Sequence, residues 1–292
     1  VDSLTGGSGT ADAIAINNNG GATFTLASTD LIEARMATIE KIVAAGASNQ
    51  IISITASELL FEDGVTTIDL SADTDATANN VIDVSNDDTG TNAWTLTGSA
   101  GIDTITGDSG VDTITGGAGA DVITGGAGAD VITGGAGADV IAGGDGDDSF
   151  VYLLTADLFT SQVKVDGSVA GNGGSSDQLT VGTSGTAFAI ADNDVWTGIT
   201  TVEKIVAVAN TAAVTIDLDL TAYAAGIRTI DLSAGTAATG NIIKVDEFTT
   251  AGSATGTLTL TGSATGVTTI TGGDGADVII GGSAADVIDG GL

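Results

Sequence analysis

The sequence predicts an all-β fold, a β-solenoid (parallel β-helix) in which short strands stack as successive rungs. Three observations support this prediction: a nonapeptide repeat, a longer tandem duplication, and short β-branched runs that alternate with polar residues. The composition agrees, because 292 residues with 45 Gly, no Pro and 3% aromatic residues suit a regular, repetitive backbone better than an ordinary globule.

The nonapeptide repeat occupies residues 97–150, which divide into six units without a remainder. The units read TGSAGIDTI, TGDSGVDTI, TGGAGADVI three times, and AGGDGDDSF. Glycines allow a tight turn to adopt positive φ and to aim its carbonyls inward. The Asp adds a carboxylate, and the apolar residue two positions later begins a strand that faces a core. Carbonyl and carboxylate oxygens are hard ligands that suit Ca²⁺. A Gly-rich linker with solvated acids would have no reason to keep this apolar position.

The nine-residue period predicts two columns of aspartates, if successive units form opposite sides of a flattened coil. Asp103, Asp121 and Asp139 would then stack on one edge, and Asp112, Asp130 and Asp148 on the other. Rungs lie about 4.8 Å apart, so neighbouring carboxylates repel by roughly 3 kcal/mol at an effective dielectric constant near 20. We expect four calcium ions between turns, at the pairs 103/121, 112/130, 121/139 and 130/148, and no folded column without them.

The duplication relates two halves of the chain. TIEKIVA (38–44) recurs as TVEKIVA (201–207), GVTTIDLSA (64–72) as GIRTIDLSA (226–234), and WTLTGSA (94–100) as LTLTGSA (258–264), with offsets of 163, 162 and 164 residues. Each copy is a strand-rich stretch followed by nonapeptides, and the second set reads TGSATGVTTI, TGGDGADVI and IGGSAADVI. We therefore expect two equivalent solenoid modules, each leading into a glycine-rich roll.

The β-branched runs predict the strands of these modules. Their centres are Ile42, Ile54, Ile68, Ile82, Leu96 and Ile105 in the first copy, and Ile205, Ile216, Ile230, Ile243, Leu258 and Ile270 in the second. Alternation such as Ile68-Asp69-Leu70-Ser71 is typical of half-buried strands. Only Thr29–Ile39 and Leu154–Thr160 suggest helical turns. The predicted segments are a partial repeat (1–14), module A (15–96), a β-roll (97–150), a connector (151–176), module B (177–260) and an incomplete β-roll (261–292).

The nonapeptides resemble the calcium-binding repeat of RTX proteins. The wider pattern of VEKIVA, IDLSA and LTLTGSAGIDTITG is similar to solenoid regions of bacterial RTX-type surface proteins, especially S-layer proteins. The resemblance implies calcium-binding RTX β-roll segments, type I secretion, calcium-dependent folding after export and a place outside the cell or on its surface.

The predicted calcium ligands follow from the repeat. Complete turns contain Asp121, Asp130, Asp139, Asp148 and Asp277, together with Gly116, Gly117, Gly119, Gly125, Gly126, Gly128, Gly134, Gly135, Gly137, Gly143, Gly144, Gly146, Gly272, Gly273 and Gly275. Asp103, Asp112 and Asp286 lie in turns that lack one Gly, and the turn at 262–269 has Thr in the Asp position. Because the chain begins and ends inside repeats, we expect either an excerpt of a longer array or a head-to-tail joint near Asp2, Asp12, Asp277 and Asp286.

Charge and residue types exclude several functions. Six Lys and Arg oppose 38 Asp and Glu, and no cationic residue occurs between Lys41 and Lys164, which disfavours nucleic acid and anionic membranes as partners. The absence of His excludes Ser-His triads and His-ligated zinc, and the absence of Cys excludes disulfides and thiol chemistry. No apolar run approaches the length of a membrane span. With only six Glu, two of them in the duplicated EKIVA motif, we predict that the chain is not an enzyme.

Two classes of function remain. The first is a calcium-dependent extracellular structural protein that assembles with itself, as an S-layer or surface filament, with cell-surface polysaccharide as a second partner class. The second is an adhesin segment or stiff spacer of a larger protein. Less favoured alternatives are ice binding through outward Thr104, Thr106, Thr113, Thr115, Thr124 and Thr133, and the calcium module of a secreted enzyme.

Overall fold

The chain forms two compact units, which a computed structural model describes in part. The described residues are 13–16, 24–26, 41–44, 52–57, 65–86, 92–152, 159–160, 164–165, 167–172, 176–182, 187–190, 199–208, 212–218, 222, 226–237, 240–245 and 257–291. Unit 1 comprises Val1–Asp148 with Asn172–Gly174, and unit 2 comprises Ser149–Gly171 with Ser175–Leu292. The six segments expected from the sequence are a finer division, which stays a prediction.

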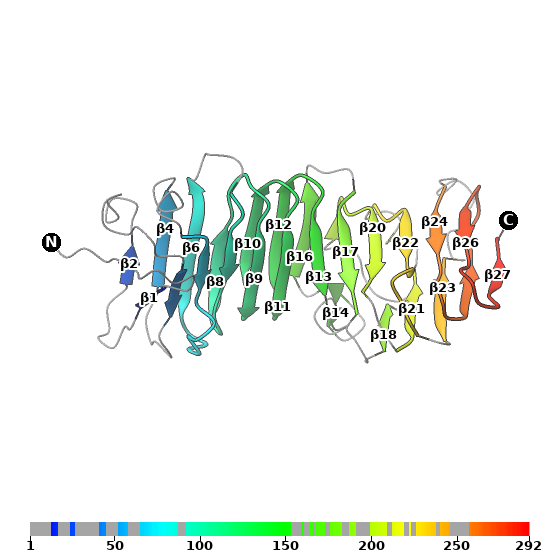
Figure 1. Cartoon of the computed structure of the whole chain (residues 1–292), viewed down its shortest axis with the longest axis horizontal. Coiled ribbons are helices and arrows are strands. Elements are labelled where there is room, and N and C mark those ends of the chain that lie inside the picture. The colour runs from blue at the N-terminus through cyan, green and yellow to red at the C-terminus, as the bar shows by residue number, and fades with distance from the viewer. Residues whose placement is uncertain are drawn as a thin grey trace. The chain divides into compact units, whose positions relative to one another are not determined.

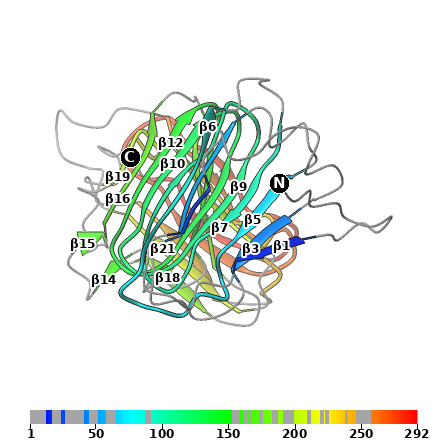
Figure 2. The same ribbon diagram turned by 90° about the vertical axis from the view of Figure 1, so that its left-hand side faces the viewer.

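Unit 1 is a parallel β-solenoid in which successive strands alternate between two sheets (Figure 1; Figure 2). One sheet contains β1 (Ala13–Ile16), β3 (Lys41–Ala44), β5 (Thr67–Asp69), β7 (Thr95–Thr97), β9 (Thr113–Ala118) and β11 (Val131–Ala136). The other contains β2 (Phe24–Leu26), β4 (Ile52–Ser57), β6 (Asn79–Asn86), β8 (Ile102–Thr106), β10 (Val122–Ala127) and β12 (Asp139–Asp145). Each strand therefore pairs with the strand two places along the chain, as a coil of stacked rungs requires.

Unit 2 repeats this arrangement. One sheet contains β13 (Ser149–Tyr152), β17 (Gln178–Val181), β20 (Lys204–Ala207), β22 (Thr229–Asp231), β24 (Thr259–Thr261) and β26 (Val278–Ile280). The other contains β18 (Phe188–Ile190), β21 (Val214–Asp217), β23 (Asn241–Lys244), β25 (Thr268–Thr271) and β27 (Val287–Asp289). In addition, β16 (Gly167–Asn172) pairs in parallel with β19 (Ile199–Thr200).

The strands confirm the predicted fold class, with two corrections. Among the described residues, only Ala222 is helical. The helical turn suggested for Leu154–Thr160 is wrong at its end, because Phe159–Thr160 forms β14, antiparallel to β15 (Lys164–Val165). The rest of that segment, and Thr29–Ile39, lie outside the described residues. The centre expected at Leu258 is displaced, since β24 is centred on Leu260 and Leu258 precedes it.

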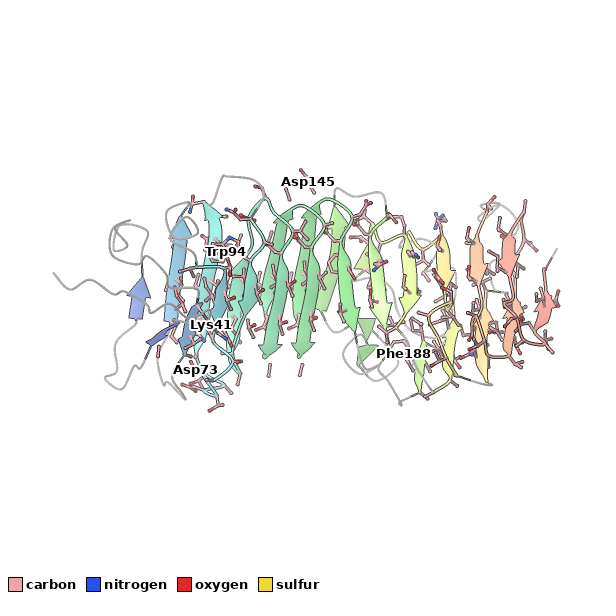
Figure 3. All side chains as sticks on the ribbon, viewed as in Figure 1. Lys41, Asp73, Trp94, Asp145 and Phe188 are labelled. Carbon is pink, nitrogen blue, oxygen red and sulfur yellow. The ribbon has the colours of Figure 1, made fainter. Side chains whose placement is uncertain are left out.

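Each sheet of unit 1 carries a continuous ladder of buried aliphatic side chains on its inner face. In one sheet, adjacent strands pair Ile42, Ile68, Leu96, Ile114 and Ile132 in register, and in the other Ile54, Ile82, Ile105, Ile123 and Ile141. All are at most 2% exposed. Trp94, labelled in Figure 3, is also buried, so it packs in the interior as a core residue. The ladder fixes the register of the rungs, and with it the position of every turn.

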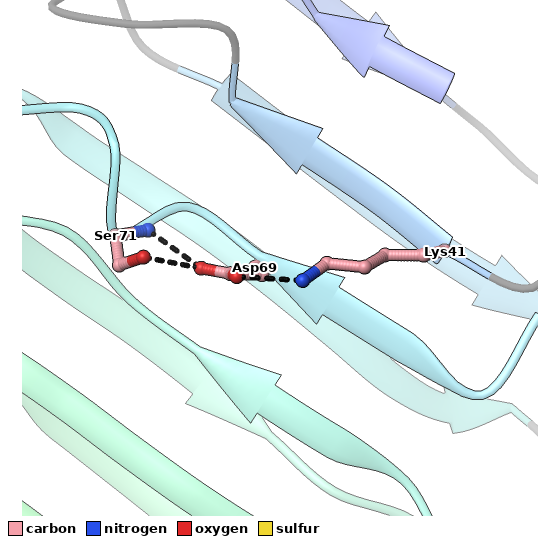
Figure 4. A network of polar contacts seen from close by, with 3 residues as sticks. All are labelled: Lys41, Asp69 and Ser71. Carbon is pink, nitrogen blue, oxygen red and sulfur yellow. Dashed lines mark hydrogen bonds and ion pairs between the residues drawn. The ribbon is translucent and has the colours of Figure 1, made fainter. Parts of the chain in front are cut away.

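The strand-rich part of the chain neutralises its rung carboxylates with lysines. Lys41 Nζ donates to Asp69 Oδ2 at 2.8 Å, and Ser71 N and Oγ donate to Asp69 Oδ1 (Figure 4). The duplicated pair Lys204–Asp231 lies at 3.5 Å. Burial alone would raise the pKa of Asp69, but the hydrogen bonds from Lys41 and Ser71 outweigh it and hold that pKa below its usual value. In these rungs, lysine side chains of the chain itself therefore serve as the counter-ions of the aspartates.

Candidate calcium centre

The six nonapeptides form the turns and strands between Thr97 and Phe150, and their aspartates stack in the two predicted columns. Asp103 N donates to Asp121 Oδ1 at 2.8 Å, and Asp121 N donates to Asp139 Oδ1 at 3.0 Å. In the other column, Asp130 N donates to Asp148 Oδ1 at 2.9 Å. The strand pairs Val122↔Val140 and Val131↔Thr113 show the same step of 18 residues. The register expected from the nine-residue period is confirmed.

In each of two aspartates in the middle of the columns, Asp121 and Asp130, one carboxylate oxygen has no hydrogen-bond partner. Asp121 and Asp130 are 0% and 1% exposed, and their Oδ2 atoms make no hydrogen bond to any described residue. A buried carboxylate oxygen without a partner costs several kcal/mol or forces the group to take up a proton. The roll has no lysine or arginine to supply a counter-charge. These oxygens are therefore stabilised by a proton in acid or by a bound cation near neutral pH.

The electrostatics of the columns lead to the same conclusion. Burial, and after it the charges of Asp103 and Asp139, raises the pKa of Asp121 to about 7. Burial, with the charges of Asp112, Asp148 and Asp108, raises the pKa of Asp130 to about 7 as well. Near neutral pH, the ionised columns are thus unstable by themselves, as the stacking argument predicted.

The glycines bring carbonyl oxygens against these carboxylates. A Cβ added to Gly116 would collide with the Gly134 carbonyl oxygen and would lie 2.5 Å from Asp121 Oδ2, so both oxygens converge beside Gly116. Gly117 and Gly119 have φ of 118° and 124°, which L side chains rarely adopt. The same positive φ occurs at Gly126, Gly128, Gly135, Gly137, Gly144, Gly146 and Gly275. Gly125 adjoins Asp130 Oδ2 and the Gly143 carbonyl oxygen in the same way.

This donor set fits Ca²⁺, which binds six to eight oxygens from carboxylates, carbonyls and water. Among the residues that the structure describes, no three acidic side chains gather closely enough to hold a metal by themselves. Most ligands must therefore be backbone carbonyls, with one or two carboxylates for each ion. Asp121 with the Gly134 carbonyl, and Asp130 with the Gly143 carbonyl, would hold such ions.

The turns that lack a glycine differ from the complete ones. Asp103 and Asp112 begin the two columns, and each accepts hydrogen bonds on both carboxylate oxygens. Burial raises the pKa of Asp103 despite its bonds to Ser99. Burial raises the pKa of Asp112 to about 6. Gly101 and Gly110 do not share the positive φ of the complete turns.

The C-terminal block brings fewer carboxylates together. Asp277 Oδ1 accepts from Leu258 N at 3.0 Å, and its Oδ2 is buried without a hydrogen-bond partner. Asp286 Oδ1 accepts from Thr268 N at 2.9 Å. The two aspartates belong to turns before different sheets, so neither stacks on the other. Of Gly272, Gly273 and Gly275, only Gly275 has a positive φ. Asp2 and Asp12 lie outside the described residues, so the proposed joint between the chain ends stays a prediction.

Sequence reasoning missed two asparagines that extend the columns into the modules. Asn80 pairs with Asp103 in the strand register, and Asn241 pairs with Thr268. Asn80 Oδ1 accepts from Ile52 N at 2.8 Å, and Asn241 Oδ1 accepts from Val214 N at 3.2 Å. Both asparagines are buried. The oxygen of each side-chain amide accepts a backbone hydrogen bond as the column aspartates do, but the amide carries no negative charge. The signal was available, because the duplication aligns NNVIDV with GNIIKV.

Comparison with known proteins identifies the repeat. A family model of four copies of the RTX calcium-binding nonapeptide repeat matches residues 95–123, 115–150 and 264–292. No match was found among curated proteins or among solved structures. The matched segments are RTX repeats, and their ligand is calcium. As a module they are structural and not catalytic. Within the described residues, no helix has the length and apolar character to cross a membrane.

Proposed function

We propose that this chain, which carries RTX calcium-binding nonapeptide repeats, is a calcium-dependent structural protein of the cell exterior that assembles with further copies of itself. The observation that carries the proposal is the pair of buried, unpartnered oxygens on Asp121 and Asp130. Because these two oxygens are buried without a partner, we expect the roll to fold near neutral pH only when a cation is bound. Millimolar calcium outside cells matches the weak affinity of extracellular calcium modules, and RTX repeats are typical of proteins exported by type I secretion.

The assembly part of the proposal is supported by one exposed core-facing side chain in the last described rung. Ile288 in β27 is 51% exposed, whereas Ile270, its register partner in β25, is fully buried. Val278 and Val287 are exposed for a different reason, because they face outward as Val122, Val131 and Val140 do within the roll. A further rung stacked on β27 would bury Ile288, whether it came from a second copy or from residues that follow. We propose a second copy as the partner.

The test compares the full chain in calcium and in EDTA. Circular dichroism should show β-structure of the roll in millimolar calcium, its loss in EDTA near pH 7.5 and its cooperative return when calcium is restored. One site at 100 times its dissociation constant contributes about 2.7 kcal/mol, so several sites together rival the whole stability of a domain. A spectrum that EDTA leaves unchanged would refute the calcium-dependent fold.

The same samples separate assembly from the alternative of a stiff spacer or adhesin segment. Electron microscopy in calcium should show sheets or filaments that disperse in EDTA. Isolated single particles at all protein concentrations in calcium would overturn self-assembly, leave the calcium roll intact and favour the spacer. The variant Ile288→Asp places a charge on the open rung and should weaken assembly without changing the calcium stoichiometry.

A further inference from the structure

The first two nonapeptides look equally incomplete in sequence, because each lacks the second glycine of the repeat. Ser99 replaces it in one turn and Asp108 in the other. The structure shows that these two replacements act on the neighbouring column aspartate in opposite ways. The difference decides which of the two turns needs calcium.

Ser99 satisfies the carboxylate of its turn by hydrogen bonding. Ser99 N donates to Asp103 Oδ2 at 2.6 Å, and Ser99 Oγ lies 3.0 and 3.1 Å from the two oxygens of the same carboxylate. The Oγ accepts in turn from Asn80 Nδ2 at 2.9 Å and from Gly101 N at 3.1 Å. One hydroxyl thus uses its donor and both acceptor positions. Both oxygens of Asp103 thus have hydrogen-bond partners, as both oxygens of Asp112 do, and the two turns differ in that one adds a hydroxyl and the other a second carboxylate.

Asp108 supplies the same backbone donor but no hydroxyl. Asp108 N donates to Asp112 Oδ2 at 3.0 Å, and Asp108 Oδ1 accepts from Gly110 N at 2.6 Å. This backbone bond places a second acidic residue directly beside Asp112, and the two negative charges repel. Both residues are buried, at 5% and 0% exposed. Two neighbouring buried carboxylates are stabilised by a proton or a cation.

Two further features point to a cation at this turn. The next aspartate of the column, Asp130, has its buried Oδ2 beside Gly125, whose carbonyl oxygen lies against the turn at 107–112, and the charge of Asp108 acts on it. A Cβ on Gly107 would collide with both Asp112 Oδ2 and the Gly125 carbonyl oxygen, so these oxygens converge at the same place. Gly98 brings Asp103 Oδ2 and the Gly116 carbonyl oxygen together in the same way, so the carboxylate of Asp108 is what distinguishes the turn at 107–112. Carboxylate and carbonyl oxygens thus surround a space that holds no positive residue.

We propose that Asp108 is a calcium ligand outside the repeat consensus. The turn at 107–112 then binds calcium through Asp108 and Asp112. The turn at 98–103, in which Ser99 bonds to Asp103, binds no calcium. This inference rests on the proposed calcium-dependent fold. It replaces the four equivalent sites expected in residues 97–150 by three unequal ones. The site at Asp108 carries an additional negative ligand and should be the tightest, because ligand charge sets the affinity of calcium sites.

The test is calorimetric titration of the calcium-free full chain with CaCl₂. Asp108→Asn should lose one ion, or bind one ion at least about tenfold more weakly. Asp108→Ser introduces the residue that position 99 already carries, so it should lose one ion and retain its circular dichroism spectrum in calcium. Asp103→Asn should bind as the wild type does, because the Ser99 hydroxyl already bonds to both oxygens of the Asp103 carboxylate. Asp145→Asn is the charge-matched control, since Asp145 is exposed at the edge of the roll (Figure 3).

The reciprocal variant Ser99→Asp recreates the acidic pair in the first column and should add one ion. Wild-type binding by Asp108→Asn, or loss of an ion in Asp103→Asn, would overturn the assignment while leaving the calcium-dependent fold in place. A wild-type chain that binds no calcium would instead refute the proposed function, and the assignment with it.

Discussion

Acid should replace calcium in stabilising the nonapeptide roll, because protons neutralise the same buried carboxylates. Asp121 and Asp130 have pKa values raised from 3.8 to about 7, first by burial and then by neighbouring aspartates. A carboxyl whose pKa is higher in the folded than in the unfolded chain contributes stability below its ordinary pKa, and this contribution is lost as the pH rises through the folded value. The calcium-free roll should therefore become less stable between about pH 4 and pH 7.

The expected magnitude is large relative to the stability of a domain. A shift of about three pKa units corresponds to about 4 kcal/mol for a single carboxylate, against 5 to 15 kcal/mol for a typical domain. Screening by water at the turns and coupling to the neighbouring aspartates make this value an upper limit for each carboxylate. Asp69 and Asp231 have lowered pKa values, so their stabilising contributions are lost only below the pH range considered and do not mask the effect.

The assay is urea unfolding of the full chain in EDTA, followed by circular dichroism at pH 4.5, 6.0 and 7.5. The urea midpoint should fall as the pH rises, and in millimolar calcium the trend should reverse. The matched control is Asp121→Asn, whose amide keeps the acceptor for Asp103 N and does not titrate. Asn80 shows that such an amide fits the column. A midpoint in EDTA that stays constant or rises from pH 4.5 to pH 7.5 would contradict the reasoning.

Two further substitutions test the geometry of the turns and rungs by urea unfolding in calcium. Gly135→Ala should lower the free energy of unfolding by more than about 2 kcal/mol, because Gly135 has φ of 107° and an added Cβ would collide with the Gly117 carbonyl oxygen. The control Ala138→Ser, at an exposed position of the same turn, should change the free energy of unfolding little. Equal effects of the two variants would argue against the turn conformation. Ile132→Ala should lower the free energy of unfolding by about 2 to 5 kcal/mol, because Ile132 is fully buried. Val131→Ala, on the outer face of the same strand, should lower it much less. The reverse order would mean that the inner and outer faces of the strand are exchanged.

The sequence predicted the rungs well where a single short period repeats. Residues 97–150 repeat an aspartate and, two residues later, an apolar residue at the same two positions of every nine, so only one stacking aligns both sets, and the structure has it. The displacement of the strand centre from Leu258 to Leu260 arose because both positions face inward, and alternation cannot distinguish a shift of two residues.

The hydrogen bonds that close the column ends could not be predicted from the repeat. Asn80 and Ser99 are 19 residues apart, and Ile52 and Asn80 are 28 apart, in rungs whose lengths follow no fixed period. The same holds for Thr268, whose hydroxyl accepts from Ser263 N at 3.0 Å where a carboxylate would otherwise lie. Only the stacking of neighbouring rungs reveals that these neutral groups take the aspartate's place.

The chain balances its rung carboxylates in two different ways, and this division explains where calcium acts. In the modules, Lys41 and Lys204 reach across one rung to Asp69 and Asp231, so the counter-charge is covalently part of the chain and independent of the medium. In the nonapeptide roll no lysine or arginine is present, and aspartates follow one another at every rung of both columns. In unit 1, Asn80 and Ser99 complete the first column without charge, at the boundary between the rungs paired with lysine and the roll that we propose to depend on calcium. We therefore expect calcium to act on the roll, whereas the rungs of Lys41 and Lys204 keep neutralising contacts that do not depend on it.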